Sequence, residues 1–383
     1  MELKSIEYSQ FLDMPEEWKL EKCSFGKINL IVGKNATGKS KTLNILKSLS
    51  NILTIPRTLA RYFGGEYSVV FNKTNDEIKY ILKYERNRVL EEILDVKGKN
   101  LLKRKNEGKG EIYFEELEKK MSFQTPENEI AALSRRDMVQ HSFLEDLYNW
   151  GSNLVHFKFG SHLGKDHFAL FTNKQDDLEN KNLLYDTNKV TRVFKKGREK
   201  YGDPFLESII SDMDTIGYQI DSVDIQQPKS IVIEGAFSSQ PVGLAVKESD
   251  LKSITDQHDM SQGMFRTISL IIQINYAQFE NKHSCILIDD IGEGLDFERS
   301  CNLIKLLIEK AKNPIFQLIM ATNDRFVMNI VPLEYWLIIQ RKGNISNIIN
   351  YENSKEIFDD FLDTGLSNFD FFSSNSFLKN DKN

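Results

Sequence analysis

Residues 33–40 have the types and spacing of a phosphate-binding loop. They read GKNATGKS and match G-x-x-x-x-G-K-[ST] at every fixed position. Glycines at both ends let the backbone curl so that amide groups point at phosphate oxygens, and a following helix adds its positive end. Lys39 would contact the β- and γ-phosphates, and the hydroxyl of Ser40 would bind Mg²⁺. The predicted nucleoside triphosphate site comprises Gly33, Lys34, Asn35, Ala36, Thr37, Gly38, Lys39, Ser40 and Lys41.

A second candidate site lies at the end of another apolar run, residues 285–288, which Asp289 and Asp290 follow directly. A carboxylate at the end of a strand can bind Mg²⁺ through water, and a second one beside it can orient or deprotonate an attacking water. Many strands end in a solvated aspartate, so this pattern gains weight only from the phosphate loop. We expect Asp289 to help place Mg²⁺ and Asp290 to act as the catalytic carboxylate.

The spacing of apolar residues predicts the elements that position these sites. Residues 28–32 form an apolar run, and leucines and isoleucines three and four apart over 42–53 predict a helix after it. Alternating residues over 67–71 and 78–84 predict a hairpin. Helical spacing over 189–218 is interrupted at 202–204. Further strands are expected at 230–234, 285–288, 315–320 and 336–340, with a helix and a loose end after 346.

Three further motifs follow in a known order. Residues 260–264, MSQGM, resemble the LSGGQ signature of ABC-type ATPases and open a helical run. Residues 289–296, DDIGEGLD, resemble the family's Walker B motif and D-loop, and 321–324, ATND, occupy the place of its switch loop. The spacing from Ser261 to Asp289 is 28 residues (289 − 261), which is of the right size. The chain resembles the ABC superfamily over residues 1–84 and 226–345.

This resemblance implies an α/β P-loop NTPase fold, namely an ABC-type head with a mixed sheet and an inserted, mostly helical lobe. In this family the signature of one subunit caps ATP held by the phosphate loop of another. It implies ATP and Mg²⁺ as ligands and an ATP-dependent head-to-head dimer or higher oligomer. Ser261 and Gly263 would close the partner's site, and Asp296 would tie the two D-loops together.

Two departures from the family pattern predict slow ATP hydrolysis. Asp290 stands where the family usually has a glutamate, and a side chain one methylene shorter misplaces the carboxylate, which can cost on the order of a hundredfold in rate. Asn323 stands where a histidine is usual, and it can hydrogen-bond a phosphate but cannot take a proton. Glu293 could compensate for the short Asp290.

The long insert distinguishes branches of the superfamily. Ser40 and Ser261 are 221 residues apart (261 − 40), which is far more than a transporter nucleotide domain usually has. The segment leading into the loop resembles the SMC and RecF-like "AAA family ATPase" branch. Residues 261–266 and 290–299 resemble stand-alone ATPases of bacterial anti-phage defence systems. Only 59 residues follow the switch loop (383 − 324), so we expect an effector such as a nuclease to be a separate protein.

The expected organisation has four parts: residues 1–84 and 226–345 as the two parts of the ATPase head, 85–225 as the inserted helical lobe with a charged arm, and 346–383 as a tail. Residues 97–109 carry six basic residues and one acidic residue. This arm is either a solvated hairpin or helix, or a contact to DNA phosphates, as in a DNA-repair ATPase. Gln124, before the lobe, is the candidate for the family's Mg²⁺-binding glutamine.

Composition bounds the remaining possibilities. The 383 residues are 40% hydrophobic and 28% charged, so a packed core can form. The net charge of −6 disfavours a protein that coats nucleic acid generally. Three widely separated cysteines disfavour disulfide and zinc scaffolds. No apolar run is long enough to span a bilayer. We therefore expect a cytoplasmic protein without a membrane partner.

Overall fold

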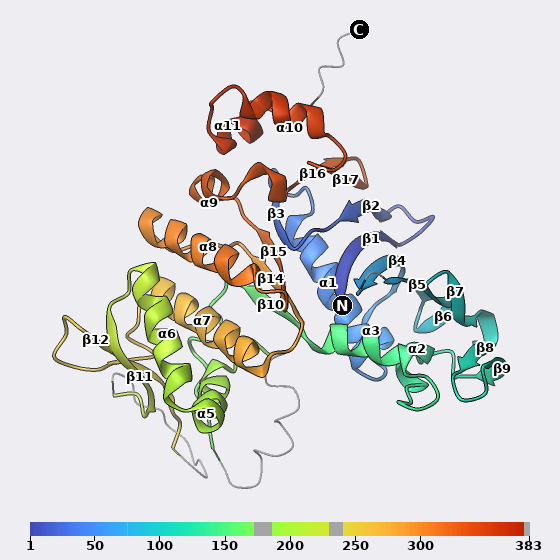
Figure 1. Ribbon diagram of the computed structural model, residues 1–383, viewed down its shortest axis with the longest axis horizontal. Helices are drawn as coiled ribbons and strands as arrows, with labels where there is room; N and C mark the ends of the chain where they lie inside the picture. Colours follow the sequence, from blue (N-terminus) through green and yellow to red (C-terminus); the bar gives the residue numbers. More distant parts are fainter. Residues whose placement is uncertain (75, 172–185, 230–239, 379–383) are drawn as a thin grey trace. The chain divides into compact units, whose positions relative to one another are not determined.

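The computed structural model describes residues 1–74, 76–171, 186–229 and 240–378 (Figure 1). The chain divides into two compact units. Unit 1 comprises residues 1–154 and 332–383, and unit 2 comprises residues 155–331. The predicted lobe 85–225 is therefore shared between the two units. The strand predicted at 230–234 lies outside the described residues.

Unit 1 is built on one mixed sheet. Its strand order is β3-β16-β17-β2-β1-β4-β5-β6-β7-β8-β9. β16 runs parallel to β3, β17 runs parallel to β2, and the pairs from β1 to β9 are antiparallel. The strands are β1 (Glu2–Gln10), β2 (Trp18–Ser24), β3 (Ile28–Val32), β4 (Gly64–Lys73), β5 (Asp76–Glu85), β6 (Arg88–Val96), β7 (Lys99–Arg104), β8 (Lys109–Phe114), β9 (Lys119–Gln124), β16 (Trp336–Lys342) and β17 (Ile345–Asn350).

The hairpin predicted at 67–71 and 78–84 is confirmed as β4 and β5, whose alternate residues are buried. The helical lobe expected from residue 85 is wrong in its first part, because residues 88–124 continue the sheet as four strands. Dense charge hid the alternation there: β6 buries Val89, Glu92 and Leu94, and its half-buried positions mix charged and apolar residues. The strand β17 was also not predicted.

One basic residue of the predicted arm, Arg104, belongs to a buried ion pair inside this sheet. Arg104 on β7 lies opposite Glu92 on β6, and both are fully buried. Glu92 accepts hydrogen bonds from Tyr80 and from the amides of Ala131 and Ala132 at the start of α2 (Ala131–Ser134). Burial raises the pKa of Glu92, and the charge of Arg104 lowers it. Arg104 is therefore a structural residue and not a DNA contact.

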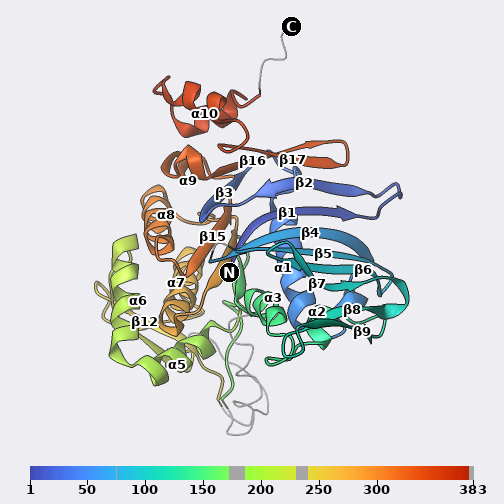
Figure 2. The same cartoon turned by 45° about the vertical axis from the view of Figure 1, so that its right-hand side comes forward.

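Of the remaining helices of unit 1, α1 (Lys39–Thr54) and α3 (Phe143–Ser152) lie beside the sheet, and α10 (Lys355–Leu362) and α11 (Asn368–Ser373) follow its last strand. Figure 2 shows α1 and α3 beside the curved strands of the sheet. Ser50 on α1 donates a hydrogen bond of 2.8 Å to the carbonyl of Gly151 on α3. Gly151 allows this approach, since a Cβ there would lie 2.8 Å from Thr54 Cγ2. Short 3₁₀ turns at Thr58–Arg61, Asn106–Gly108 and Leu333–Tyr335, with α10 and α11, complete the unit.

Unit 2 combines a short sheet with a group of helices. β14 (Ser284–Asp289) lies between β10 (Leu154–Lys158) and the parallel strand β15 (Phe316–Ala321). Helices α5 (Val190–Tyr201) and α6 (Asp203–Ile216) match the helical spacing predicted over 189–218, with the break at Gly202. The other elements are α7 (Gln262–Glu280), α8 (Phe297–Ala311), α9 (Arg325–Ile330), β11 (Ile220–Gln226), β12 (Gly243–Glu248) and β13 (Thr255–Asp256).

Within the described part of the chain, no helix combines the length and the apolar character needed to cross a bilayer. The large mixed sheet with its flanking helices confirms the predicted α/β fold class.

Candidate functional site

The phosphate loop lies where the sequence predicted it, between β3 and α1 of unit 1. All five residues of β3 are buried. Gly33 follows it, and a Cβ there would lie 2.7 Å from the side chain and carbonyl of Ile339 on β16. Gly38 has a φ of 117°, a conformation that side chains rarely adopt. Both glycines of the motif are therefore required by the local backbone and packing.

The start of α1 has features that favour an anion. Gly38 is its N-cap and provides no side-chain hydrogen bond, and the first turn has no acidic residue. The backbone amide groups and the helix dipole at such an N-terminus favour the binding of a phosphate. The ammonium of Lys39 lies within the loop, donating to the carbonyls of Gly33 at 2.7 Å and of Lys34 at 3.3 Å. The loop residues fit the phosphates of a nucleotide.

Three residues distant in sequence support the loop, and sequence reasoning missed them. Ser346 on β17 donates a hydrogen bond of 2.9 Å to the carbonyl of Thr37. A Cβ on Gly38 would lie 3.2 Å from Trp18 and 3.3 Å from Ile339. The ammonium of Lys41 lies 3.9 Å from the centre of the Trp18 ring, a cation–π geometry. Burial, with a smaller effect of Arg341, lowers the pKa of Lys41.

The predicted carboxylates lie at the end of β14 in unit 2. Asp289 is buried as the last residue of the strand, and Asp290 follows with a φ of 56°. The amide of Glu293 donates to the carbonyl of Asp290 at 3.2 Å, which closes a turn over 290–293. The switch segment lies beside this turn, because the amide of Ile291 donates to the carbonyl of Ala321. Asn323 is exposed.

The signature and the D-loop contact each other within unit 2. Ser261 caps α7 by accepting from the amide of Met264 at 3.2 Å, and the residue remains exposed. Gly263 is buried against the D-loop, since a Cβ there would lie 2.6 Å from the carbonyl of Gly294. Asp296 caps α8 through the amide of Arg299, and this bond, together with the charge of Arg299, lowers the pKa of Asp296.

The structure does not support the prediction that Gln124 is a Mg²⁺ ligand. Gln124 is exposed at the end of β9, the last strand in the order of unit 1, whereas the phosphate loop follows β3, the first. Nine strands separate β3 from β9 in the sheet order, so Gln124 does not lie on a strand that neighbours the phosphate loop. The segment that does lie beside Asp289 is 159–161, where the amide of Phe159 donates to the Asp289 carbonyl at 2.9 Å. It carries no glutamine, so no sequence motif marked it.

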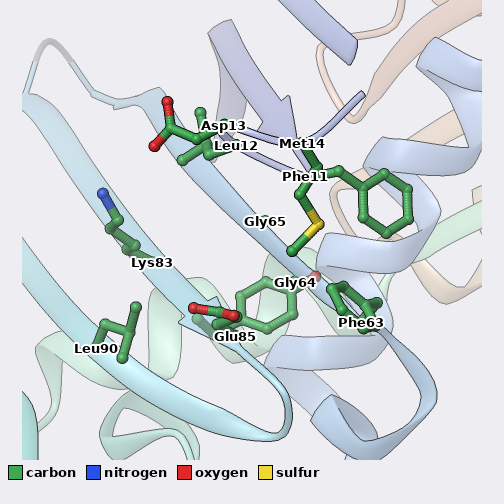
Figure 3. Close-up of a pocket in the computed structure, with 11 residues that line it drawn as sticks. Phe11, Leu12, Asp13, Met14, Phe63, Gly64, Gly65, Lys83, Glu85 and Leu90 are labelled. Atoms are coloured by element: carbon green, nitrogen blue, oxygen red, sulfur yellow. The ribbon is translucent and has the colours of Figure 1, made fainter. Parts of the chain in front are cut away.

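A separate hollow of about 180 Å³ lies in unit 1 at the turn after β1 (Figure 3). Its floor includes Gly64 and Gly65, and Figure 3 shows Met14 reaching over them. A Cβ on Gly65 would lie 3.0 Å from Tyr8, so the glycine is needed for close packing. The lining contains Phe11, Leu12, Asp13, Met14, Phe63, Gly64, Gly65, Lys83, Tyr84, Glu85 and Leu90. None of the phosphate-loop residues is among them.

Comparisons with known proteins support the fold. No family profile matches the sequence, and no curated protein matches it. Among solved structures, a SMC head bound to the C-winged helix domain of ScpA aligns with a TM-score of 0.51 and 14% identity, over 91% of this chain and 98% of that one. The Pyrococcus furiosus SMC head with an extended coiled coil, bound to the C-terminal domain of ScpA, aligns with a TM-score of 0.50 and 12% identity, over 94% and 99%. The chain has the fold of an SMC head domain, which is a P-loop ATPase fold.

Proposed function

We propose that the protein binds ATP, hydrolyses it slowly and dimerises around it as a nucleotide-gated switch. The observation that carries this proposal is the phosphate loop. Two glycines that leave little room for a side chain, a helix N-terminus without a side-chain cap and the inward ammonium of Lys39 together support a site for nucleotide phosphates. The SMC-head fold supports the same function.

The roles of the other residues follow from this proposal. The hydroxyl of Ser40 and the carboxylate of Asp289 are oxygen ligands of the kind that Mg²⁺ prefers, and we assign them to it. Mg²⁺, when bound, supplies positive charge that neutralises the phosphate oxygens. Asp290 orients or deprotonates the attacking water, and Asn323 contacts the γ-phosphate.

The exposed Ser261 is the residue through which a second copy closes the site. It begins a 19-residue helix, whose N-terminal amides favour a phosphate approaching from outside. Each copy would offer its signature to the ATP of the other, so that ATP holds the dimer together and hydrolysis releases it. Gly263 supports this surface from within, packed on the D-loop, and Asp296 lies exposed beside it.

The experiment is to measure the mass of the 44.3 kDa chain in solution with and without ATP. We expect a dimer with ATP and a monomer without it. Lys39→Ala should abolish both ATP binding and dimerisation, whereas Ser261→Arg should retain ATP binding and lose the dimer. A Ser261→Arg variant that still dimerises with ATP would refute the sandwich arrangement.

The biological setting that we propose is a bacterial anti-phage defence complex in which this ATPase controls a separate effector, such as a nuclease. The resemblance of residues 261–266 and 290–299 to stand-alone defence ATPases motivates this setting. A second candidate function is DNA binding in repair. The exposed lysines Lys99, Lys103 and Lys105, near the end of the sheet in unit 1, favour it.

A further inference from the structure

One arginine of the signature helix joins three parts of unit 2. Arg266 lies on α7, five residues after Ser261, and is only 8% exposed. Its side chain donates to three backbone carbonyls outside its own helix: those of Ser161 at 2.8 Å, Glu293 at 2.9 Å and Gly160 at 3.0 Å. Burial lowers the pKa of Arg266, and the charge of Glu293 partly offsets this effect. The guanidinium stays charged, because arginine is not deprotonated in proteins.

The two segments held by Arg266 flank the predicted catalytic carboxylate. A Cβ on Gly160 would lie 2.8 Å from Oε2 of Glu293 and 3.2 Å from Oδ2 of Asp290. Both carboxylates therefore lie against a residue that has no side chain. Arg266 fixes Gly160 on one side of this contact and the turn over 290–293 on the other.

Only an arginine can make this set of contacts. Its planar group offers several N–H donors in fixed directions, whereas the ammonium of a lysine acts as a single point. Gly160, Ser161 and Glu293 lie in irregular backbone, where their carbonyls lack the regular partners of a helix or strand. A substitution at Arg266 would release both segments at once, while the helix α7 itself would keep its own hydrogen bonds.

We propose that Arg266 is a positioning residue that couples the signature to the hydrolytic carboxylate Asp290. This inference rests on the proposed function. In the proposed dimer Ser261 contacts the ATP of the partner, whereas Asp290 acts on the ATP of its own subunit. Arg266 is the connection between those two sites within one chain, so ATP bound by one copy helps to aim Asp290 in the other.

The test compares ATP turnover of the full chain with Arg266→Lys and Arg266→Met. The matched control is Arg198→Met, which removes an arginine of α5 in the same unit whose partner is Asp203. We expect both Arg266 variants to lower kcat by about tenfold to a hundredfold, the range that misplaced catalytic groups produce. The Kd for a fluorescent ATP analogue should stay within about twofold of the parent value, because the phosphate loop is unchanged.

Cooperativity is the readout that a merely structural role would not move. Two coupled sites allow a Hill coefficient above 1 and up to about 2 for ATP turnover, and we expect it to fall to about 1 in the Arg266 variants. Gly160→Ala is a second variant that leaves the arginine in place and displaces the carboxylates directly. It should lower kcat while the dimer still forms with ATP.

The inference is overturned if folded Arg266 variants keep a kcat and a Hill coefficient like those of Arg198→Met. If the Arg266 variants lose their cooperative thermal unfolding, Gly160→Ala decides, and its unchanged kcat would equally overturn the inference. Lys39→Ala distinguishes a failure of the proposed function from a failure of the proposed coupling. If Lys39→Ala retains turnover, the proposed function itself fails; if it loses turnover while the Arg266 variants do not, only the coupling fails.

Discussion

At the residue scale, Asp290 connects the sequence to the predicted reaction rate. Asp290 directly follows the buried strand β14 and has a φ of 56°, so its short carboxylate projects from a tight turn. A general base contributes about a hundredfold or more to a rate. We therefore expect Asp290→Asn to lower ATP turnover by about a hundredfold while ATP binding persists. Steady-state phosphate release measures this change.

The control for that prediction is Glu309→Gln, which changes an exposed carboxylate of α8 that pairs with Lys312. Its turnover should match that of the parent. Equal turnover in Asp290→Asn and Glu309→Gln would show that Asp290 is not the base, and Glu293, which lies against the same Gly160, would then be the next residue to test.

Gly38 supports a second prediction at this scale. Its φ of 117° disfavours any side chain, and a Cβ would also press on Trp18 and Ile339 at 3.2 and 3.3 Å. We expect Gly38→Ala to lower the free energy of unfolding by about 1–3 kcal/mol and to weaken ATP binding at least tenfold, about the affinity that 1.4 kcal/mol represents. Urea denaturation and titration with a fluorescent ATP analogue measure the two effects.

The matched control is Gly343→Ala in the turn between β16 and β17. Gly343 also has a positive φ, 62°, but a Cβ there would meet no atom within 4 Å. This variant reports backbone strain alone. If it weakens ATP binding as much as Gly38→Ala, the contact with Trp18 is irrelevant to the phosphate loop.

At the element scale, Glu280 ties α5 to the end of α7. Its carboxylate accepts from Lys200 at 2.6 Å and from the hydroxyl of Tyr201 at 2.8 Å. Burial alone would raise the pKa of Glu280, but the hydrogen bonds from Lys200, Tyr201, Tyr276 and Lys282 outweigh it and lower the pKa to about 2. A carboxylate with a lowered pKa stabilises the fold when it is ionised.

Because the pKa of Glu280 is lowered in the folded protein, the stability that Glu280 contributes depends on pH in a definite direction. The contribution is complete above the ordinary pKa of 4.5 and is lost as the pH falls toward about 2. We expect Glu280→Gln to lower the urea midpoint of unfolding at pH 7 and pH 5, and the difference from the parent to shrink at pH 3.5. The same series with Glu309→Gln provides the baseline. A difference that stays constant from pH 7 to pH 3.5 would contradict the assignment.

At the scale of the whole molecule, the chain distributes the predicted chemistry over two compact units. Unit 1 contains the phosphate loop, and unit 2 contains the signature, the carboxylates and the D-loop. Unit 1 also contains the basic arm. Within the arm, Arg104 is buried with Glu92, Lys97 pairs with Asp76 and Lys109 pairs with Glu107. Partly neutralised lysines and a net charge of −6 favour the ATP switch over general DNA binding.

Charge reversal tests the DNA alternative. We expect the triple change Lys99→Glu, Lys103→Glu and Lys105→Glu to leave ATP turnover within about twofold, because none of these lysines is near the phosphate loop in the strand order. If the protein binds DNA through this arm, its DNA affinity should fall about tenfold or more at 0.1 M salt. Fluorescence anisotropy with a labelled duplex measures the affinity.

The control must carry the same change in net charge. Lys4→Glu, Lys22→Glu and Lys355→Glu alter three exposed lysines elsewhere in unit 1. DNA affinity that falls equally in both triple variants indicates a general electrostatic effect and excludes the arm as a specific contact.

The sequence by itself determined the motifs and the elements next to them. Short-range spacing within residues 28–53 and 260–290 was enough to predict four features. They are the phosphate loop, the helix after it, the helix that opens at the signature and the strand that ends in Asp289. The hairpin of β4 and β5 was equally predictable, because residue types alternate along both strands. Arg104 was counted in the basic arm because a sequence displays its charge. Its burial opposite Glu92 cannot be seen in the sequence.

Only the tertiary structure decided which distant residues meet. Trp18, Ile339 and Ser346 support the loop from three strands, and strand order within a sheet is set by packing and not by local propensity. The same order removed Gln124 from the site. The backbone carbonyls that Arg266 holds carry no sequence signal at all, because every residue has one.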